Sequence, residues 1–139
     1  MEPGNGVILR KLSTIEQVVR ELHSLGRIGM ADVENDWRTR RAVERNLQVA
    51  IEAMIDVCQR WIAVRGLTPA ATGQEAVARC VESGLLSTEA PYRRMVQFRN
   101  FIVHRYEQVD AAILVDIVNH RLGDFERFVQ EVRAHVILP

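Results

Sequence analysis

Hydrophobic residues recur every three or four positions through most of the chain, which is the spacing of amphipathic helices. In the first third this spacing predicts a helix over residues 7–28. A second, longer helix is predicted over 32–65, where Gly66 and then Pro69 act as stop signals. At the usual rise it would be ~50 Å long, more than a bundle of this size needs. We therefore expect its charged first turns, over 36–45, to project or to pack against a partner.

Three further helices are predicted in the second half of the chain. A short helix over 72–82 is followed by a helix that reaches about residue 105. A last helix, capped by Asp110, runs to the C-terminus and carries an apolar series: Ile113, Ile117, Leu122, Phe125, Phe128, Val132 and Val136.

No segment alternates as a strand does, and no segment repeats. The pattern therefore predicts an all-α fold, an antiparallel four-helix bundle with one extra short helix. A chain of 139 residues suits a single domain. We expect that domain over 7–139, behind a flexible N-terminal tail over 1–6.

Composition narrows the classes of function. The chain is 47% hydrophobic and carries no net charge, so any contact with nucleic acid must come from a local basic patch. No stretch approaches ~20 uncharged apolar residues, and the N-terminus lacks a signal-peptide core, which predicts a cytoplasmic protein without a membrane span. Cys58 and Cys80 fall on apolar helix faces and are expected to be buried free thiols.

Such a local basic patch lies in the helix that ends near residue 105. From Pro91 to Tyr106 the chain has no acidic residue and four arginines, Arg93, Arg94, Arg99 and Arg105. Arg99 and His104 are five residues apart, so a straight helix sets them well around its axis from each other. They can converge if the arginine reaches round, if the helix loosens near His104, or if a second copy supplies the other residue. The last arrangement makes a symmetric dimer the natural setting for a site.

The segment Arg99-Asn100-x-x-x-His104-x-Tyr106 resembles the R-x4-H-x-Y signature of HEPN domains. Its surroundings, Phe98 to Tyr106, are similar to the HepT toxin branch of that superfamily. The stretch 45–56 is similar to the long second helix of the family. The resemblance implies a HEPN-like bundle that cleaves RNA without a metal or other cofactor, with two Arg/His sets lining a cleft across a homodimer.

The chemistry of these side chains suits that reaction. The imidazole of His104 titrates near neutrality, so it can take and return a proton within one reaction. The guanidinium of Arg99 is permanently charged and can stabilise charge that builds on a phosphorane. Arg99 and His104 are therefore the candidate catalytic residues, and Asn100 is expected to orient the imidazole.

The resemblance also implies a partner. In the HepT branch the tyrosine that matches Tyr106 accepts AMP from a nucleotidyltransferase, the MntA-type antitoxin. An adenylate beside His104 would place bulk and negative charge where an RNA phosphate must lie. Arg93, Arg94 and Arg105 fit either an RNA-binding rim, for mRNA or tRNA, or an ordinary solvated face.

Two other interpretations compete with a ribonuclease. Glu52 and Asp56 lie on one helix face and suggest a metal site, but no matching pair of a carboxylate and a histidine recurs. Ion pairs with arginines of a neighbouring helix, such as Arg99, fit them better. The remaining alternative is a non-catalytic helical module that binds a nucleotidyltransferase partner or a nucleotide. The intact Arg/Asn/His/Tyr set favours the ribonuclease, and the zero net charge weighs mildly against it.

Overall fold

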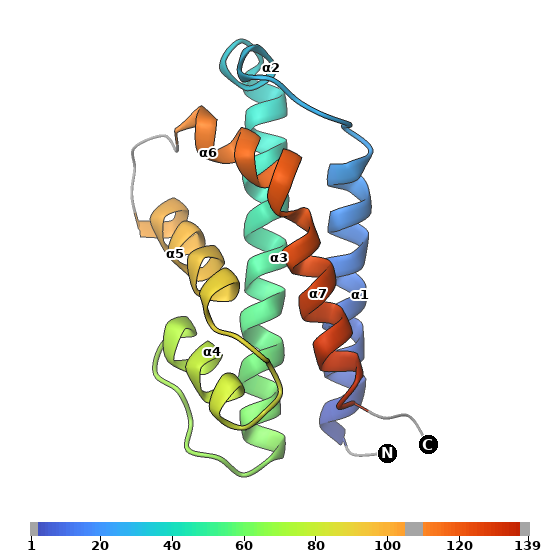
Figure 1. Ribbon diagram of the computed structural model, residues 1–139, viewed down its shortest axis with the longest axis vertical. Helices are drawn as coiled ribbons and strands as arrows, with labels where there is room; N and C mark the ends of the chain where they lie inside the picture. Colours follow the sequence, from blue (N-terminus) through green and yellow to red (C-terminus); the bar gives the residue numbers. More distant parts are fainter. Residues whose placement is uncertain (1–2, 105–109, 137–139) are drawn as a thin grey trace.

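The computed structural model describes residues 3–104 and 110–136, with side chains for 5–103 and 110–136 (Figure 1). The elements in chain order are α1 (Pro3–His23), α2 (Met30–Glu34), α3 (Trp37–Val64), α4 (Gly73–Glu82), α5 (Ala90–His104), α6 (Ala111–Asp116), the π-helical turn η1 (Ile117–Arg121) and α7 (Leu122–Arg133). These described residues form helices and no strand, which confirms the predicted all-α class. None of the helices is long and apolar enough to cross a lipid bilayer.

Helix α3 is the central element of an antiparallel bundle. α1 packs along it in the opposite direction, α7 packs on α1, and α4 and α5 contact the other side of α3 (Figure 1). Buried residues of α3 step by three and four along one face, and Leu47, Met54 and Val57 are fully shielded from solvent. Aromatic rings close the core, where Tyr92 of α5 meets Phe128 of α7 edge to face at 5.4 Å between ring centroids.

The first helix differs from its predicted bounds at both ends. It begins at Pro3, so residues 3–6 are helical and do not form the predicted tail, of which residues 1–2 lie outside the described part. It ends at His23 instead of residue 28, because Gly26 takes a φ of +68°, a left-handed conformation that glycine adopts at little cost.

The long second helix was predicted as one piece, and this is wrong. The structure breaks it into α2 and α3 at Asp36. The carboxylate of Asp36 accepts hydrogen bonds from the backbone N–H groups of Arg38 and Thr39, at 3.0 and 3.4 Å. A side chain that caps the first turn in this way ends any helix that arrives from upstream.

The last helix contains a shift in phase. Asp110 caps α6 as predicted, accepting from the N–H of Ala112 at 2.9 Å. However, Ile113 is 47% exposed and Ile117 is only partly buried, whereas their neighbours Leu114 and Val118 are buried. The π-helical turn explains this, because its extra residue rotates the preceding turns relative to α7.

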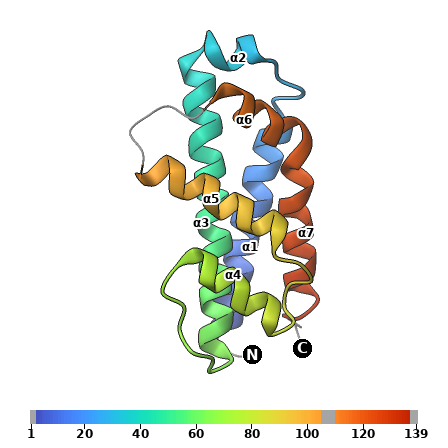
Figure 2. The same ribbon diagram turned by 60° about the vertical axis from the view of Figure 1, so that its left-hand side comes forward.

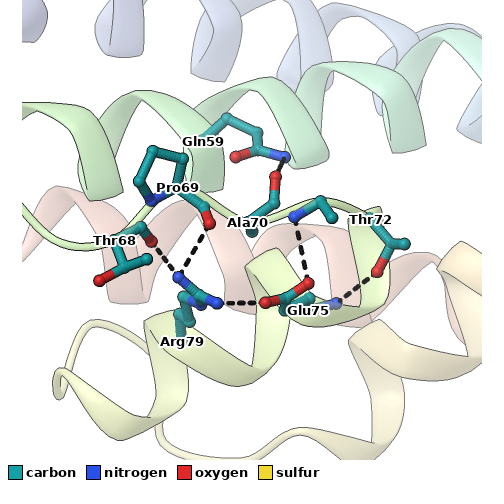
Figure 3. Close-up of polar contacts among 8 residues, drawn as sticks. Gln59, Thr68, Pro69, Ala70, Thr72, Glu75 and Arg79 are labelled. Carbon is teal, nitrogen blue, oxygen red and sulfur yellow. Dashed lines mark hydrogen bonds and ion pairs between the residues drawn. The ribbon is translucent and has the colours of Figure 1, made fainter.

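The connection from α3 to α4 is pinned by one ion pair, shown in Figure 3. Arg79 of α4 pairs with Glu75 and donates to the carbonyl groups of Thr68 and Pro69, the latter at 3.0 Å. Glu75 in turn accepts from the N–H of Ala71 at 3.1 Å. These bonds fix the connecting loop to α4, and α4 in turn contacts both α3 and α5.

Candidate active site on α5

Helix α5 crosses α3 near the middle of α3 (Figure 2). It is held there by buried side chains, among them Tyr92, Val96 and Phe98. Helix α4 packs closely against α3 and α5 at Gly73, its first residue. A Cβ added at Gly73 would lie 3.0 Å from Ile55 of α3 and 3.2 Å from Val96 of α5. The backbone that carries the candidate catalytic residues is thus fixed by apolar packing on two helices.

A polar cluster anchors the first turn of α5 to α7. The hydroxyl of Tyr92 and the hydroxyl of Ser87 both donate short hydrogen bonds to Glu131, and the N–H of Ser87 adds a third at 3.0 Å. Burial, and then the bond to Glu131, raises the pKa of Tyr92 far above its ordinary value. Burial alone would also raise the pKa of Glu131, but the donated hydrogen bonds outweigh it and lower that pKa. Sequence reasoning missed this cluster, because its members lie up to 44 residues apart and share no motif.

Arg99 lies between α5 and α3. Its Nη1 donates to Oδ1 of Asn100 at 3.0 Å, and its Nη2 is 3.7 Å from Oε2 of Glu52 on α3. The predicted pairing of Glu52 with Arg99 is confirmed. Asn100 accepts this bond through its Oδ1, and its expected role in orienting the imidazole of His104 stays a prediction, because that side chain lies outside the described residues.

The guanidinium of Arg99 is only partly satisfied. Its Nε is buried and has no hydrogen-bond partner within the described residues, and the Nη2 contact to Glu52 is longer than a hydrogen bond. A guanidinium binds carboxylate or phosphate with two parallel donors. The Nε and Nη2 edge of Arg99 therefore retains donor capacity, and a single carboxylate stands beside it.

The second carboxylate of the predicted pair faces elsewhere. Asp56 pairs with Lys11 of α1 at 3.0 Å and with no arginine among the described residues, so the predicted arginine pairing is wrong for Asp56. Within residues 5–103 and 110–136, no group of three or more histidine, cysteine, aspartate or glutamate side chains could hold a metal ion. The described side chains that can take part in chemistry at this site are those of Arg99 and Asn100. The end of α5 adds His104, whose side chain lies outside the described part.

The other predicted site residues are placed as follows. Arg93 and Arg94 are exposed on α5, and Arg94 borders a groove of about 180 Å³ between α5 and the α6–α7 segment. His104 is the last residue of α5, and its side chain lies outside the described part, as do Arg105 and Tyr106. The structure therefore brings together Arg99, Asn100 and Glu52 and leaves the roles of the other residues as predictions.

Comparison with known proteins assigns the family. The family described as "Ribonuclease HepT-like" matches residues 15–132, which is most of the chain. The chain therefore belongs to the HepT-like ribonucleases, the HEPN branch that the motif on α5 resembles.

Individual relatives agree with this assignment. The mRNA nuclease HepT of Shewanella oneidensis is 26% identical over 132 residues, covering 94% of this chain and 98% of that protein. The tri-AMPylated HEPN toxin of the same organism, solved in complex with an MNT antitoxin, superimposes with a TM-score of 0.84 at 25% identity, covering 92% of this chain and 97% of that one. YutE of Bacillus subtilis, a cytosolic protein of unknown function, shares the fold alone, with a TM-score of 0.76 at 15% identity over 93% of this chain and 87% of its own.

Proposed function

We propose that this chain is the ribonuclease toxin of a toxin–antitoxin pair, a metal-independent endoribonuclease that works as a homodimer and cuts mRNA. The observation that carries the proposal is Arg99, held at the α3–α5 crossing with an unsatisfied donor edge. The relative named as an mRNA nuclease and the toxin solved with its antitoxin support the substrate and the pairing.

In the proposed reaction His104 removes the proton from a ribose 2′-hydroxyl. The 2′-oxygen then attacks the adjacent phosphorus, and the bond to the 5′-oxygen breaks as that oxygen receives a proton from a protonated imidazole. Arg99 stabilises the charge on the phosphorane through the terminal nitrogens of its partly exposed guanidinium. The step needs no metal or cofactor, because the imidazole moves the protons and the guanidinium supplies the positive charge.

A homodimer can bring together Arg99 and His104, which a single straight helix holds apart. Five residues turn a helix by ~500°, so positions 99 and 104 of α5 are ~140° apart around its axis. Arg99 is directed towards Glu52 of α3 within its own subunit. A second subunit that brings its own α5 alongside provides the missing partner in each half of a shared cleft.

The proposed antitoxin is a nucleotidyltransferase of the MntA type that acts on Tyr106. The phenol oxygen of Tyr106 bonds to the α-phosphorus of ATP, and pyrophosphate leaves. The adenylate then occupies the phosphate position next to Arg99 with negative charge and bulk. The relative solved in tri-AMPylated form with its antitoxin supports this regulation.

Induced expression tests the proposal, with growth and RNA integrity as readouts. Arg99→Ala and His104→Ala are each expected to abolish growth arrest while circular dichroism and dimer mass stay unchanged. Arg60→Ala, an exposed arginine on α3 outside the site, is the matched control and should remain toxic. Equal toxicity of all three variants would favour the non-catalytic module instead.

Mixed dimers test the shared cleft. Subunits carrying Arg99→Ala and subunits carrying His104→Ala are each expected to be inactive alone. If Arg99 of one subunit works with His104 of the other, mixing them restores one intact site, and about a quarter of wild-type activity returns in a random mixture. No recovery after verified subunit exchange would contradict a site built from two subunits.

A further inference from the structure

Three arginines form a line on the outer face of α3, before α5 crosses it. Arg38, Arg41 and Arg45 are exposed and lie three and four residues apart, so they follow one helix face. We refer to them as the arginine face. At ~100° per residue, Glu52 falls within ~60° of all three. The line therefore leads along α3 to the residue that pairs with Arg99.

Neutralising groups near the arginine face are engaged elsewhere. Glu44 pairs with Arg40 at 3.4 Å. Asp36 caps α3 and also interacts electrostatically with Arg38, at the far end of the arginine face from Arg99. Within the described part of the chain, Arg41 and Arg45 have no carboxylate within ion-pair distance. Arg38 lies in the first turn of α3, where a cation opposes the helix dipole, so at least this arginine does not serve to stabilise the helix.

An exposed indole stands at the far end of this line. Trp37, the first residue of α3, is 66% exposed, the largest exposure among the large apolar side chains described. The guanidinium carbon of Arg38 lies 5.4 Å from its ring centroid. A tryptophan beside a row of arginines is the arrangement that binds single-stranded nucleic acid, with bases stacked on the ring and phosphates on the guanidinium groups.

The arginine face is continuous with Arg99. Two turns, ~10 Å of helix, separate Arg45 from Glu52. Nη2 of Arg99 lies 3.7 Å from Glu52. In Figure 2 neither α4 nor α5 covers the part of α3 between the crossing and α2, and α6 contacts α3 there. A single-stranded RNA whose cleaved phosphate meets Arg99 can thus extend along Arg45, Arg41 and Arg38 to Trp37.

We propose that the arginine face and Trp37 bind the single-stranded RNA that flanks the cleaved phosphate. The proposal rests on the ribonuclease function proposed above and replaces Arg93, Arg94 and Arg105 as the main RNA-binding rim. A protein partner is the competing occupant, because arginine and tryptophan are also enriched at protein interfaces. The row of guanidinium groups that runs along α3 towards Arg99 favours RNA, since its phosphates form a matching row of negative charges.

Binding of a 2′-O-methyl RNA of about 12 nucleotides tests the proposal, since a strand of that length fits the usual site sizes and cannot be cut. The variant Arg38→Gln/Arg41→Gln/Arg45→Gln is compared with Arg10→Gln/Arg20→Gln/Arg60→Gln, which removes three exposed arginines from other faces. Both lower the net charge equally. Fluorescence polarisation across a salt series should show the slope of log K against log salt flattened by ~2 in the first variant, at ~0.7 per lost phosphate contact. The control slope should match that of wild type.

Trp37→Ala is expected to weaken binding about tenfold through the lost stacking. Leu67→Ala, another exposed apolar residue, serves as its control and should leave affinity unchanged. Trp37→Phe keeps an aromatic ring and should recover most of the affinity. Circular dichroism establishes that each variant is folded.

Equal flattening in both triple variants would overturn the proposal, because charge alone would explain the binding. Unchanged RNA binding by the arginine-face variant, with loss of a complex with a co-expressed MNT-type nucleotidyltransferase, would assign this surface to a protein partner and also overturn it. If wild type cuts RNA while that variant still binds normally, only this inference fails. If wild type cuts no RNA at all, the proposed function fails.

Discussion

Replacing Glu52 with glutamine isolates the part that its charge plays beside Arg99. The substitution keeps the size of the side chain and one acceptor oxygen, and it removes the negative charge 3.7 Å from Nη2 of Arg99. Arg99 and Glu52 are 26% and 37% exposed, so solvent screens the pair. Partly exposed pairs of this kind are worth ~0.2–1 kcal/mol, and the variant should lose no more stability than that.

The clearest expected effect of the substitution is a lower KM. In the free protein the carboxylate of Glu52 lies 3.7 Å from Nη2 of Arg99, so an RNA phosphate that binds this guanidinium must compete with its negative charge. Removing the charge should lower KM by up to about fivefold, which is the upper end of the pair energy expressed as a ratio. The value of kcat should fall or stay level, because the guanidinium of Arg99 loses a group that holds it in place.

The assay is initial-rate cleavage of a fluorescent single-stranded RNA, with KM and kcat measured separately. Asp56→Asn is the matched control. It removes the same charge one helical turn away, where the partner is Lys11. A KM unchanged in Glu52→Gln, or lowered equally in Asp56→Asn, would refute the competition between Glu52 and the RNA phosphate.

Three further predictions concern stability and follow from single contacts. Because the folded-state pKa of Glu131 is lowered, its carboxylate stabilises the fold above its ordinary pKa, and that stability is lost as pH falls through the lowered value. In urea unfolding, the difference in free energy of unfolding between wild type and Glu131→Gln should therefore shrink below about pH 4. Gly73→Ala should cost ~1–3 kcal/mol, because its Cβ would meet the side chain of Ile55, whereas Gly123→Ala has free space and should cost nothing or stabilise its helix. Asp36→Ala should cost ~1 kcal/mol in thermal unfolding through loss of the α3 cap.

Helix positions were predictable because apolar spacing alone determines which face of a helix is buried. The bundle and the cap at Asp110 followed from local spacing, and the pairing of Glu52 with Arg99 followed from opposite charges on helices expected to be neighbours. The break at Asp36 did not, because an aspartate in a charged run is also compatible with an exposed helix face. Only the competition between its side chain and the backbone decides the outcome.

Two other features required the folded chain. The π-helical turn rotates α6, so Leu114 is buried in place of Ile113, and apolar spacing cannot reveal an inserted residue when both neighbours are hydrophobic. The cluster of Tyr92 and Glu131 joins α5 to α7 across 39 residues. Hydrogen bonds over such separations depend on how helices pack and leave no periodic signal in the sequence.

The central claim is that His104 and Arg99 cleave RNA through the 2′-hydroxyl without a metal. The most direct measurement is cleavage of a defined single-stranded RNA by the purified protein in EDTA, with the new ends identified by mass spectrometry. The account predicts cleavage in EDTA, products that end in a 2′,3′-cyclic phosphate, and no cleavage by His104→Ala. Cleavage that stops in EDTA and returns with added divalent metal, or that continues at the wild-type rate in His104→Ala, would contradict it.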